Sequence, residues 1–313
     1  MLPTKQWSIR LFQVAGITVF LHWSWILFFP YRLTMTLHQY SSIGWTVAEA
    51  LALFAIVLMH EFGHSLACRQ VGGRADQIVL WPLGGVAYVD PPQRPGATLW
   101  SIAAGPLVNV ALFPILTGAW YLSVALGWPE AMRNLHGFLT SIWTINFVLL
   151  GFNLLPIYPL DGGQMLRSLL WFAVGRARSL LIASSIGLVA TVGGIVTLLC
   201  STKPQSYQAF AWTGIILLFV LEQCRRGFLE ARALSRLERI PRRPGFTCPS
   251  CKSAPPLAAL WLCGHCRNRC DLFESHGVCP HCEAQFTATR CIDCGGLSPI
   301  GEWVGPAPPV LNR

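Results

Sequence analysis

Charged residues are scarce in this sequence. Asp, Glu, Lys and Arg make up 12% of the 313 residues, about half the share found in a typical soluble globular protein. The mean hydropathy is +0.48, and 53% of the residues are apolar. A soluble fold of this size could not cover its surface with so few charges, and disorder requires low hydrophobicity together with high charge. The composition therefore indicates a membrane protein.

Six apolar stretches are long enough to cross a bilayer as helices. The first follows Lys5 and Arg10, as in a signal peptide, but it is long, aromatic and without a clear small-residue cleavage site, so we expect a retained span. We predict a multi-pass α-helical membrane domain with about six transmembrane helices. The stretches cover about Ile17–Thr36, Thr46–Gln70, Ala97–Leu126, His136–Leu155, Ser179–Cys200 and Gln208–Cys224.

The basic residues of the short loops predict an orientation in the cell membrane with both termini in the cytoplasm. The cytoplasmic flanks then carry Lys5, Arg10, Arg69, Arg74, Arg94, Arg167, Arg176 and Arg178, whereas the outer loops carry Arg32, Arg133 and Lys203. The reverse orientation would place the basic excess outside. The basic run from Arg225 to Arg243 supports the same choice.

The segment Ile78–Val89 lies between two of these stretches and is too short to span as a helix. It is apolar and β-branched, and Pro82, Gly84 and Gly85 interrupt it. We interpret it as a bent β-hairpin at or in the membrane surface. A plain interfacial loop is the alternative.

The second stretch contains His60-Glu61-Phe62-Gly63-His64, an H-E-x-x-H motif. On a helix, residues four positions apart share a face, so the two imidazoles can hold one metal ion. Glu61 lies beside them, where it can take a proton from a metal-bound water. Two core histidines with an unrelated Glu are the alternative, but ionisable groups are costly in a membrane helix and are functional by default.

A catalytic zinc usually has three protein ligands and a water. Asp161 is the candidate for the third ligand, because it follows a long apolar stretch and two prolines, Pro156 and Pro159, that cannot continue a helix. We expect the chain to unwind there and present Asp161 inward, since irregular backbone in a membrane lines a protein cavity or water. A helix N-cap is the alternative role.

Four motifs together resemble the site-2 protease family of intramembrane zinc metalloproteases. They are His60–His64, Pro82–Gly85, Ala104–Asn109 and Asn153–Gly163, and the resemblance covers about residues 10 to 225. It implies His60, His64 and Asp161 as zinc ligands and Glu61 as general base.

The resemblance also implies roles for residues around the metal. It implies that Asn153 helps to hold the substrate or the oxyanion, and that Gly84 and Gly85 belong to a β element that engages the substrate. Within Gly105-Pro106…Asn109 it implies a mainly structural turn that allows close helix contact. The sequence departs from the family pattern at Tyr158, where a proline is common, and nothing in it resembles a PDZ domain or a CBS pair.

The function predicted is zinc-dependent hydrolysis of a peptide bond in or near a transmembrane segment of a membrane protein. A substrate helix must unwind locally, and pairing with the edge of the 78–89 hairpin would replace its backbone hydrogen bonds. Two alternatives are a non-catalytic, metal-holding membrane adaptor and a solute or metal transporter. Glu61 argues against the adaptor, because a bare metal site needs no base. Transporters commonly carry internal repeats, and the absence of a second copy of either metal motif argues against a transporter.

The C-terminal region is rich in cysteine. Eight of the 12 cysteines form four C-x-x-C pairs, which resemble a double zinc ribbon and suit two closed, structural zinc sites in a reducing compartment. We expect sequential pairing of the motifs, with nested and interleaved pairing as alternatives. The expected ligands are Cys248, Cys251, Cys263, Cys266, Cys279, Cys282, Cys291 and Cys294.

The predicted organisation has three parts. Residues 1–226 form the membrane-embedded metalloprotease domain, residues 227–246 a basic amphipathic linker, and residues 247–313 a cytosolic double zinc-ribbon domain. The expected cofactors are one catalytic and two structural Zn²⁺ ions. The expected partners are the lipid bilayer, a membrane protein substrate with a transmembrane helix, and a cytosolic protein on the ribbons. Few aromatic stacking groups in the tail argue against a nucleic-acid partner.

Overall fold

The computed structural model describes residues 7–26, 30, 39–81, 84–200 and 207–303. The chain forms two compact units. The first, here called the membrane unit, comprises Met1–Pro91 and Pro95–Leu229. The second, here called the cysteine-rich unit, comprises Pro92–Arg94 and Glu230–Arg313. We describe each unit by itself.

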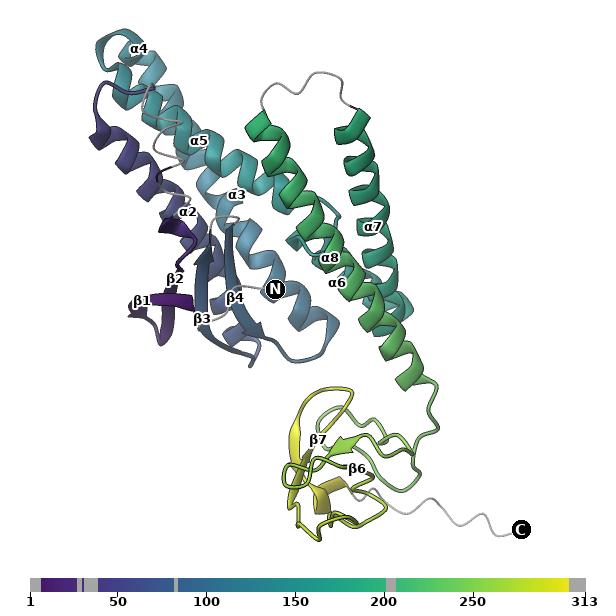
Figure 1. The fold of residues 1–313 in the computed structure, drawn as a ribbon. Helices are drawn as coiled ribbons and strands as arrows, with labels where there is room; N and C mark the ends of the chain where they lie inside the picture. The colour runs from purple at the N-terminus through teal and green to yellow at the C-terminus, as the bar shows by residue number, and fades with distance from the viewer. Residues whose placement is uncertain (1–6, 27–29, 31–38, 82–83, 201–206, 304–313) are drawn as a thin grey trace. The chain divides into compact units, whose positions relative to one another are not determined.

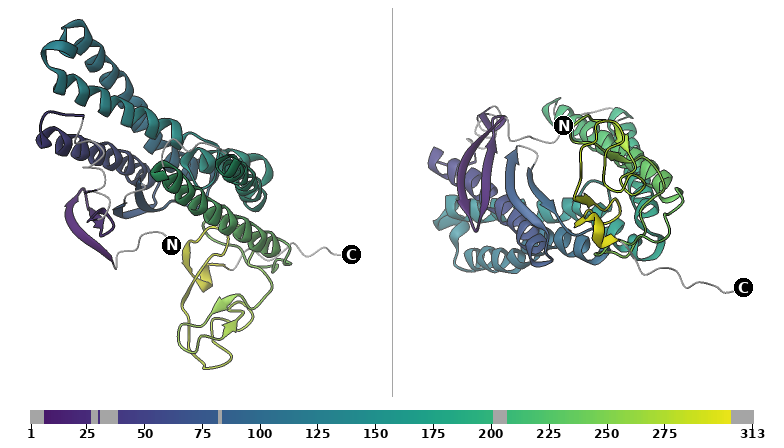
Figure 2. Two further views of the ribbon diagram at one scale, coloured as in Figure 1. Left: turned by 45° about the horizontal axis from the view of Figure 1, so that its top comes forward. Right: turned by 90° about the horizontal axis from the view of Figure 1, so that it is seen from below.

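A four-stranded sheet opens the membrane unit (Figure 1). Its strands are β1 (Ser8–Val14), β2 (Ile17–His22), β3 (Arg74–Trp81) and β4 (Gly84–Asp90), in that order across the sheet. β1 pairs antiparallel with β2, β2 parallel with β3, and β3 antiparallel with β4. The right-hand view of Figure 2 shows the β1–β2 and β3–β4 ribbons side by side. The antiparallel β3–β4 pair corresponds to the predicted hairpin, although residues 82–83 lie outside the described part of the chain.

The prediction of a first membrane span at Ile17–Thr36 is wrong in its N-terminal part, because Ile17–His22 is strand β2. Its side chains Ile17 and Val19 are fully buried against Ile78 and Leu80 of β3. Hydropathy over a window cannot separate a buried strand from a helix, since both present apolar residues. Residues 27–29 and 31–38 of the predicted span lie outside the described residues.

Helix α2 (Ile43–Gln70) connects the parallel strands β2 and β3. One of its faces packs Phe54, Val57, Leu58 and Phe62 onto the buried core of the sheet. Two parallel neighbouring strands need a crossover connection of this kind, because a tight turn makes the next strand antiparallel. The helix that carries the H-E-x-x-H motif is therefore held against the sheet from Phe54 to Phe62.

The remaining helices of the membrane unit follow β4. They are α3 (Pro95–Ala125), the short α4 (Trp128–Ala131), α5 (Arg133–Asn153), α6 (Asp161–Val174), α7 (Arg176–Cys200) and α8 (Tyr207–Glu238), the last of which continues into the cysteine-rich unit. Within the described residues, four helices are long and apolar enough to cross a membrane: α2, α3, α5 and α7. The chain is thus a helical membrane protein with four candidate spans, and α3 packs against α2, α5 and α6.

The cysteine-rich unit has little regular structure. Its strands form two separate antiparallel pairs, β5 (Trp261–Leu262) with β6 (Arg269–Cys270) and β7 (Ala288–Arg290) with β8 (Leu297–Pro299), followed by a 3₁₀ helix, η2 (Ile300–Trp303). Part of the predicted linker belongs to this fold, because Arg243 N donates to the Pro255 carbonyl and Leu257 N donates to the Pro241 carbonyl. The unit is therefore mostly turns around its cysteine pairs.

Candidate active site and metal centres

The H-E-x-x-H residues lie in the C-terminal half of α2 and face inward. His60, Glu61 and His64 are 3%, 6% and 7% exposed. Helix α2 lies alongside α3 (Figure 1), and the two helices approach closely at Gly63, where a Cβ atom would lie 2.6 Å from the Ala104 carbonyl oxygen. The spacing of four residues places both imidazoles on one face, as expected from the sequence.

Asp161 is brought to the same point from another element. Helix α5 ends at Asn153, two prolines follow, and Asp161 opens α6. Its Oδ2 atom lies 3.1 Å from His60 Nε2 and 3.4 Å from His64 Nε2, and the two Nε2 atoms are 3.1 Å apart. The structure therefore brings together the three residues that the sequence motifs selected.

The three donor atoms fit a zinc ion. Nitrogen and oxygen ligands about 2.0–2.1 Å from a tetrahedral zinc lie about 3.3 Å from one another, close to the distances observed here. Asp161 Oδ2 is buried, and among the described residues no hydrogen-bond donor is directed at it. Three ligands also leave a fourth position for water, as in catalytic zinc sites.

The far side of each imidazole is held by a hydrogen bond. His64 Nδ1 lies 2.9 Å from the Ser101 carbonyl oxygen, and His60 Nδ1 lies 2.6 Å from Asn109 Oδ1. Because both partners are acceptors, each Nδ1 donates a proton and each Nε2 presents a lone pair toward Asp161. The sequence had suggested a mainly structural role for Asn109, whereas its side chain contacts a candidate ligand directly.

Asn146 of α5 was not selected from the sequence. Its Oδ1 accepts from Asn109 Nδ2 at 2.8 Å, and its Nδ2 donates to the Asn109 carbonyl oxygen at 3.1 Å. Both Asn residues are fully buried. An isolated Asn in an apolar helix was the available signal, since buried amides are retained in membranes where they are hydrogen-bonded.

Glu61 is hydrogen-bonded to the sheet. Its Oε2 accepts a hydrogen bond from the Ala87 N–H of β4 at 2.8 Å. Gly85, on the same strand, approaches so closely that a Cβ atom there would lie 2.3 Å from Glu61 Cγ. A glycine at position 85 is thus required by the contact with Glu61.

The other residues expected near the substrate lie at the ends of elements. Asn153 is the last residue of α5 and is partly buried. Gly84 opens β4 opposite Trp81 and has a φ of 140°, a conformation that L residues rarely adopt. Their roles toward a substrate remain predictions.

Comparison with known proteins identifies the family. The profile of peptidase family M50 matches residues 48–132 and 122–199. The zinc metalloprotease MJ0392 of Methanocaldococcus jannaschii is 35% identical over 181 residues, which are 58% of this chain and 51% of that protein. The site-2 protease structure from the same organism aligns with a TM-score of 0.51 and 29% identity, and covers 71% of this chain and 95% of that one.

This chain belongs to peptidase family M50, the site-2 protease family. The putative zinc metalloprotease sll0528 of Synechocystis is another relative, 32% identical over 191 residues, which are 58% of this chain and 49% of that protein. The chain spans about half the length of the curated relatives it matches. The family profile ends at residue 199, before Glu230–Arg313, the main segment of the cysteine-rich unit.

This M50 family member carries eight further candidate ligands in its cysteine-rich unit, and they form two groups of four. One group is Cys248, Cys251, Cys291 and Cys294, and the other is Cys263, Cys266, Cys279 and Cys282. The expectation of sequential pairing is therefore wrong, and the nested alternative holds. A backbone hydrogen bond from Thr247 N, next to the first motif, to the Trp303 carbonyl, which follows the last motif, also joins the two ends of the unit.

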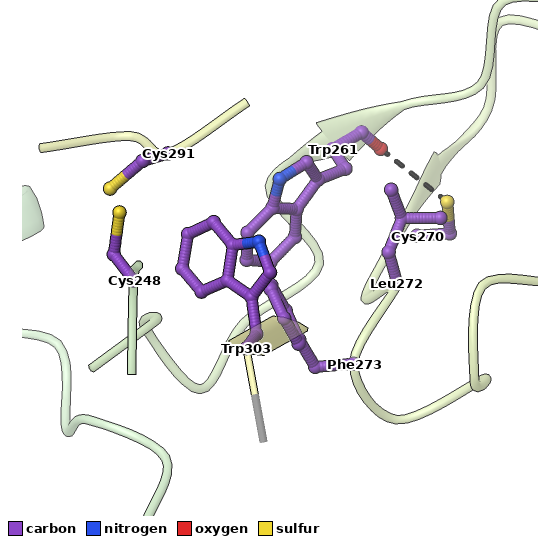
Figure 3. Close-up of a cluster of buried hydrophobic side chains, with 7 residues drawn as sticks. All are labelled: Cys248, Trp261, Cys270, Leu272, Phe273, Cys291 and Trp303. Atoms are coloured by element: carbon purple, nitrogen blue, oxygen red, sulfur yellow. Dashed lines mark hydrogen bonds between the residues drawn. The ribbon is translucent and has the colours of Figure 1, made fainter. Parts of the chain in front are cut away.

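The sulfur atoms have the spacing of tetrahedral zinc sites. Thiolates about 2.3 Å from zinc lie about 3.8 Å from one another, and the neighbouring sulfurs here are 3.7 and 3.7 Å apart in the outer group and 3.6 and 3.7 Å apart in the inner group. Figure 3 shows the Cys248 and Cys291 sulfurs pointing toward each other beside the clustered rings of Trp261, Phe273 and Trp303.

Cys270 belongs to neither group of four in this M50 family member. Its thiol is buried and donates to the Trp261 carbonyl at 3.6 Å (Figure 3). Burial raises the pKa of this thiol, which keeps it protonated and unreactive. Cys270 is thus a core residue of the unit.

Proposed function

We propose that the protein is an intramembrane zinc endopeptidase that cuts membrane proteins in or near a transmembrane segment. The observation that carries this proposal is the convergence of three donor atoms, from His60, His64 and Asp161, on one point beside Glu61. A metal-holding adaptor would need the three ligands alone. The added carboxylate supports catalysis, because peptide hydrolysis requires a group that accepts and returns a proton.

Each residue of the site has a separate task in this proposal. His60, His64 and Asp161 would hold zinc, which when bound polarises a carbonyl and makes water a better nucleophile near neutral pH. Glu61 accepts a proton from the attacking water and delivers it to the leaving amine. Asn153 would help to hold the substrate backbone near the site.

The contact between Glu61 and β4 supports a route for the substrate. β4 is an edge strand, and the Ala87 N–H is directed at Glu61 and away from β3. In an antiparallel pair, alternate residues point their backbone groups outward, so Gly85 shares the outward edge with Ala87. An unwound substrate strand that pairs with this edge would take over the Ala87 N–H and free Glu61 to accept its proton.

The remaining expectations complete the proposal. Basic residues near the ends of the candidate spans support cytoplasmic termini, and the apolar run Ile215–Leu221 of α8 supports a further span. We expect about three zinc ions per chain, one in the membrane unit and one in each cysteine group, by ligand count. A cytosolic protein remains the proposed partner of the cysteine-rich unit.

Replacing the base tests the function without a known substrate. Membrane peptides of cells that express the native protein or Glu61→Gln are compared by mass spectrometry, and zinc is measured in each purified full-length protein. We expect new peptides from the native protein alone, a loss of about 100-fold or more with Glu61→Gln, and unchanged zinc. Asp161→Ala should lose both cleavage and one zinc.

Two outcomes would contradict the proposal. Cleavage by Glu61→Gln at the native rate would show that Glu61 is not the base. A fully zinc-loaded native protein that releases no membrane peptides would favour the adaptor.

A further inference from the structure

The two histidines of the candidate zinc site are held by different kinds of partner. His64 Nδ1 faces a backbone carbonyl, that of Ser101, which can only accept a hydrogen bond. His60 Nδ1 faces the side-chain amide of Asn109. An amide has an oxygen and an NH₂ group of nearly the same size, so it can offer either an acceptor or a donor.

The orientation of the Asn109 amide decides which nitrogen of His60 carries the proton. With Oδ1 toward the ring, Nδ1 is protonated and Nε2 presents a lone pair to Asp161 and the metal position. With Nδ2 toward the ring, Nδ1 must accept, and the proton moves to Nε2. A metal binds only an unprotonated ring nitrogen, so the second orientation would block His60 as a ligand.

Asn146 removes this ambiguity. Its Nδ2 lies 3.1 Å from the Asn109 carbonyl oxygen, an atom that can only accept. The Asn146 amide is therefore fixed with Oδ1 toward Asn109 Nδ2, at 2.8 Å. This contact in turn holds Asn109 Oδ1 toward His60. The directions of all three hydrogen bonds follow from one backbone carbonyl.

We propose that Asn146 is a positioning residue for the zinc site, which selects the metal-binding tautomer of His60 by orienting the Asn109 amide. The inference rests on the proposed function, because it takes His60 to be a zinc ligand. It gives α5, which supplies none of the three candidate ligands, a direct part in the metal site. Both amides are fully buried, so water does not compete for these bonds.

A polar contact that merely joins α3 to α5 is the competing explanation, and the same helix pair offers a matched control. Trp143 Nε1 of α5 donates to Thr117 Oγ1 of α3 at 2.9 Å, as part of the same helix interface. Thr117→Val removes this interhelical bond with little change in volume. It therefore reports the cost of losing a polar α3–α5 contact that has no connection to His60.

The test measures zinc affinity in the full-length protein by chelator competition, with the zinc retained by Asp161→Ala subtracted to isolate the membrane site. We expect Asn146→Leu to weaken zinc binding there by about 10- to 100-fold, and Thr117→Val to change it by less than about twofold.

A second background separates tautomer selection from packing. Asp at position 109 has only acceptor oxygens when ionised, so it holds the His60 Nδ1 proton without help from Asn146. In Asn109→Asp, the further change Asn146→Leu should therefore leave zinc affinity unchanged or raise it, since it removes an oxygen that faces the new carboxylate. This double variant also decides the matter if Asn146→Leu alone does not fold.

Three results would overturn the inference: an equal loss of zinc affinity from Asn146→Leu in both backgrounds, no greater loss than in Thr117→Val, or a folded double variant that binds zinc 10-fold or more weakly than the native protein. Native zinc content in Asp161→Ala would instead contradict the proposed ligand set, and the inference would fall with it.

Discussion

The membrane unit and the cysteine-rich unit both gather metal-binding side chains, but they do so in opposite ways. In the membrane unit the ligands come from α2 and α6, two helices that are placed by the sheet core and by α3. In the cysteine-rich unit the ligands lie in short C-x-x-C turns, and the strands are two or three residues long. In the membrane unit the packed helices and the sheet position the ligands, whereas in the cysteine-rich unit metal binding would itself stabilise the fold.

The same difference is visible in the number of donors. Three donor atoms in the membrane unit would leave the fourth position of a tetrahedral zinc free, and Asn109 and Ser101 accept hydrogen bonds from the Nδ1 atoms of the two histidines. Four sulfurs in each cysteine group close the coordination sphere. Asp293, the acidic residue within the last C-x-x-C motif, is not one of these donors, because its carboxylate accepts two hydrogen bonds from Arg242. The first arrangement suits catalysis and the second suits structure.

The largest expected effect concerns the cysteine groups, because structural zinc contributes about 10–16 kcal/mol in small zinc domains. Nested pairing places Cys263 and Cys282 in one group, and Cys251 and Cys263 in different groups. The double variant Cys263→Ser/Cys282→Ser should therefore lose one zinc of the cysteine-rich unit, and Cys251→Ser/Cys263→Ser should lose both. Metal analysis of the full-length proteins checks this.

Sequential pairing would reverse these two zinc counts. In either variant the zinc of the membrane unit should remain, since its ligands come from other residues. Loss of that zinc would show that the two regions are not independent metal sites.

The sequence was most informative where a residue type conflicts with its surroundings. His60, Glu61 and Asp161 stand in apolar stretches where ionisable groups are expensive, so they could be selected without a structure. The ends of α2, α3, α5 and α7 also lie within a few residues of the predicted stretches. Apolar runs longer than about 20 residues have few other solutions.

The sequence was less informative where the outcome depends on partners distant in the chain. Strand β2 is apolar because it is covered by β3 and α2, which hydropathy cannot show. Asn109 and Asn146 acquire their roles from each other, across two helices. The order of C-x-x-C motifs is compatible with three pairings, and long-range contacts such as Thr247 with Trp303 select one.

An intermediate effect is expected from substitutions at two glycines, Gly105 and Gly85. They test whether the ligand His64 and the base Glu61 are positioned independently of each other. A Cβ atom at Gly105 would lie 2.2 Å from His64 Nε2, and one at Gly85 would lie 2.3 Å from Glu61 Cγ. Gly105→Ala should weaken zinc binding by about tenfold or more. Gly85→Ala should keep zinc but lower cleavage by about 100-fold, because it displaces the base.

Gly118 of α3 is the control for these glycine variants, because among the described residues no atom beyond its own stretch of helix lies within 4 Å of a Cβ atom there. Gly118→Ala should leave zinc content and cleavage at native levels. If Gly85→Ala lost zinc to the same extent as Gly105→Ala, the base and the ligands would not be positioned independently.

The smallest expected effect concerns two ion pairs of the cysteine-rich unit, made by arginines of the segment that was predicted as a linker (residues 227–246). Arg243 pairs with Asp271 at 2.6 Å, and their side chains are 17% and 7% exposed, whereas Arg242 pairs with Asp293 at 2.7 Å with side chains 33% and 32% exposed. Removing Arg243 leaves a buried carboxylate oxygen without its partner, so Arg243→Met should destabilise the zinc-loaded unit by about 1–3 kcal/mol. Arg242→Met should cost about 1 kcal/mol or less, because solvent already screens that pair. Urea unfolding of the full-length protein, followed by thiol exposure at fixed free zinc, measures both, and equal effects would contradict this ranking. Either loss is small beside that of a zinc ion, as expected if metal coordination rather than side-chain pairing holds this unit together.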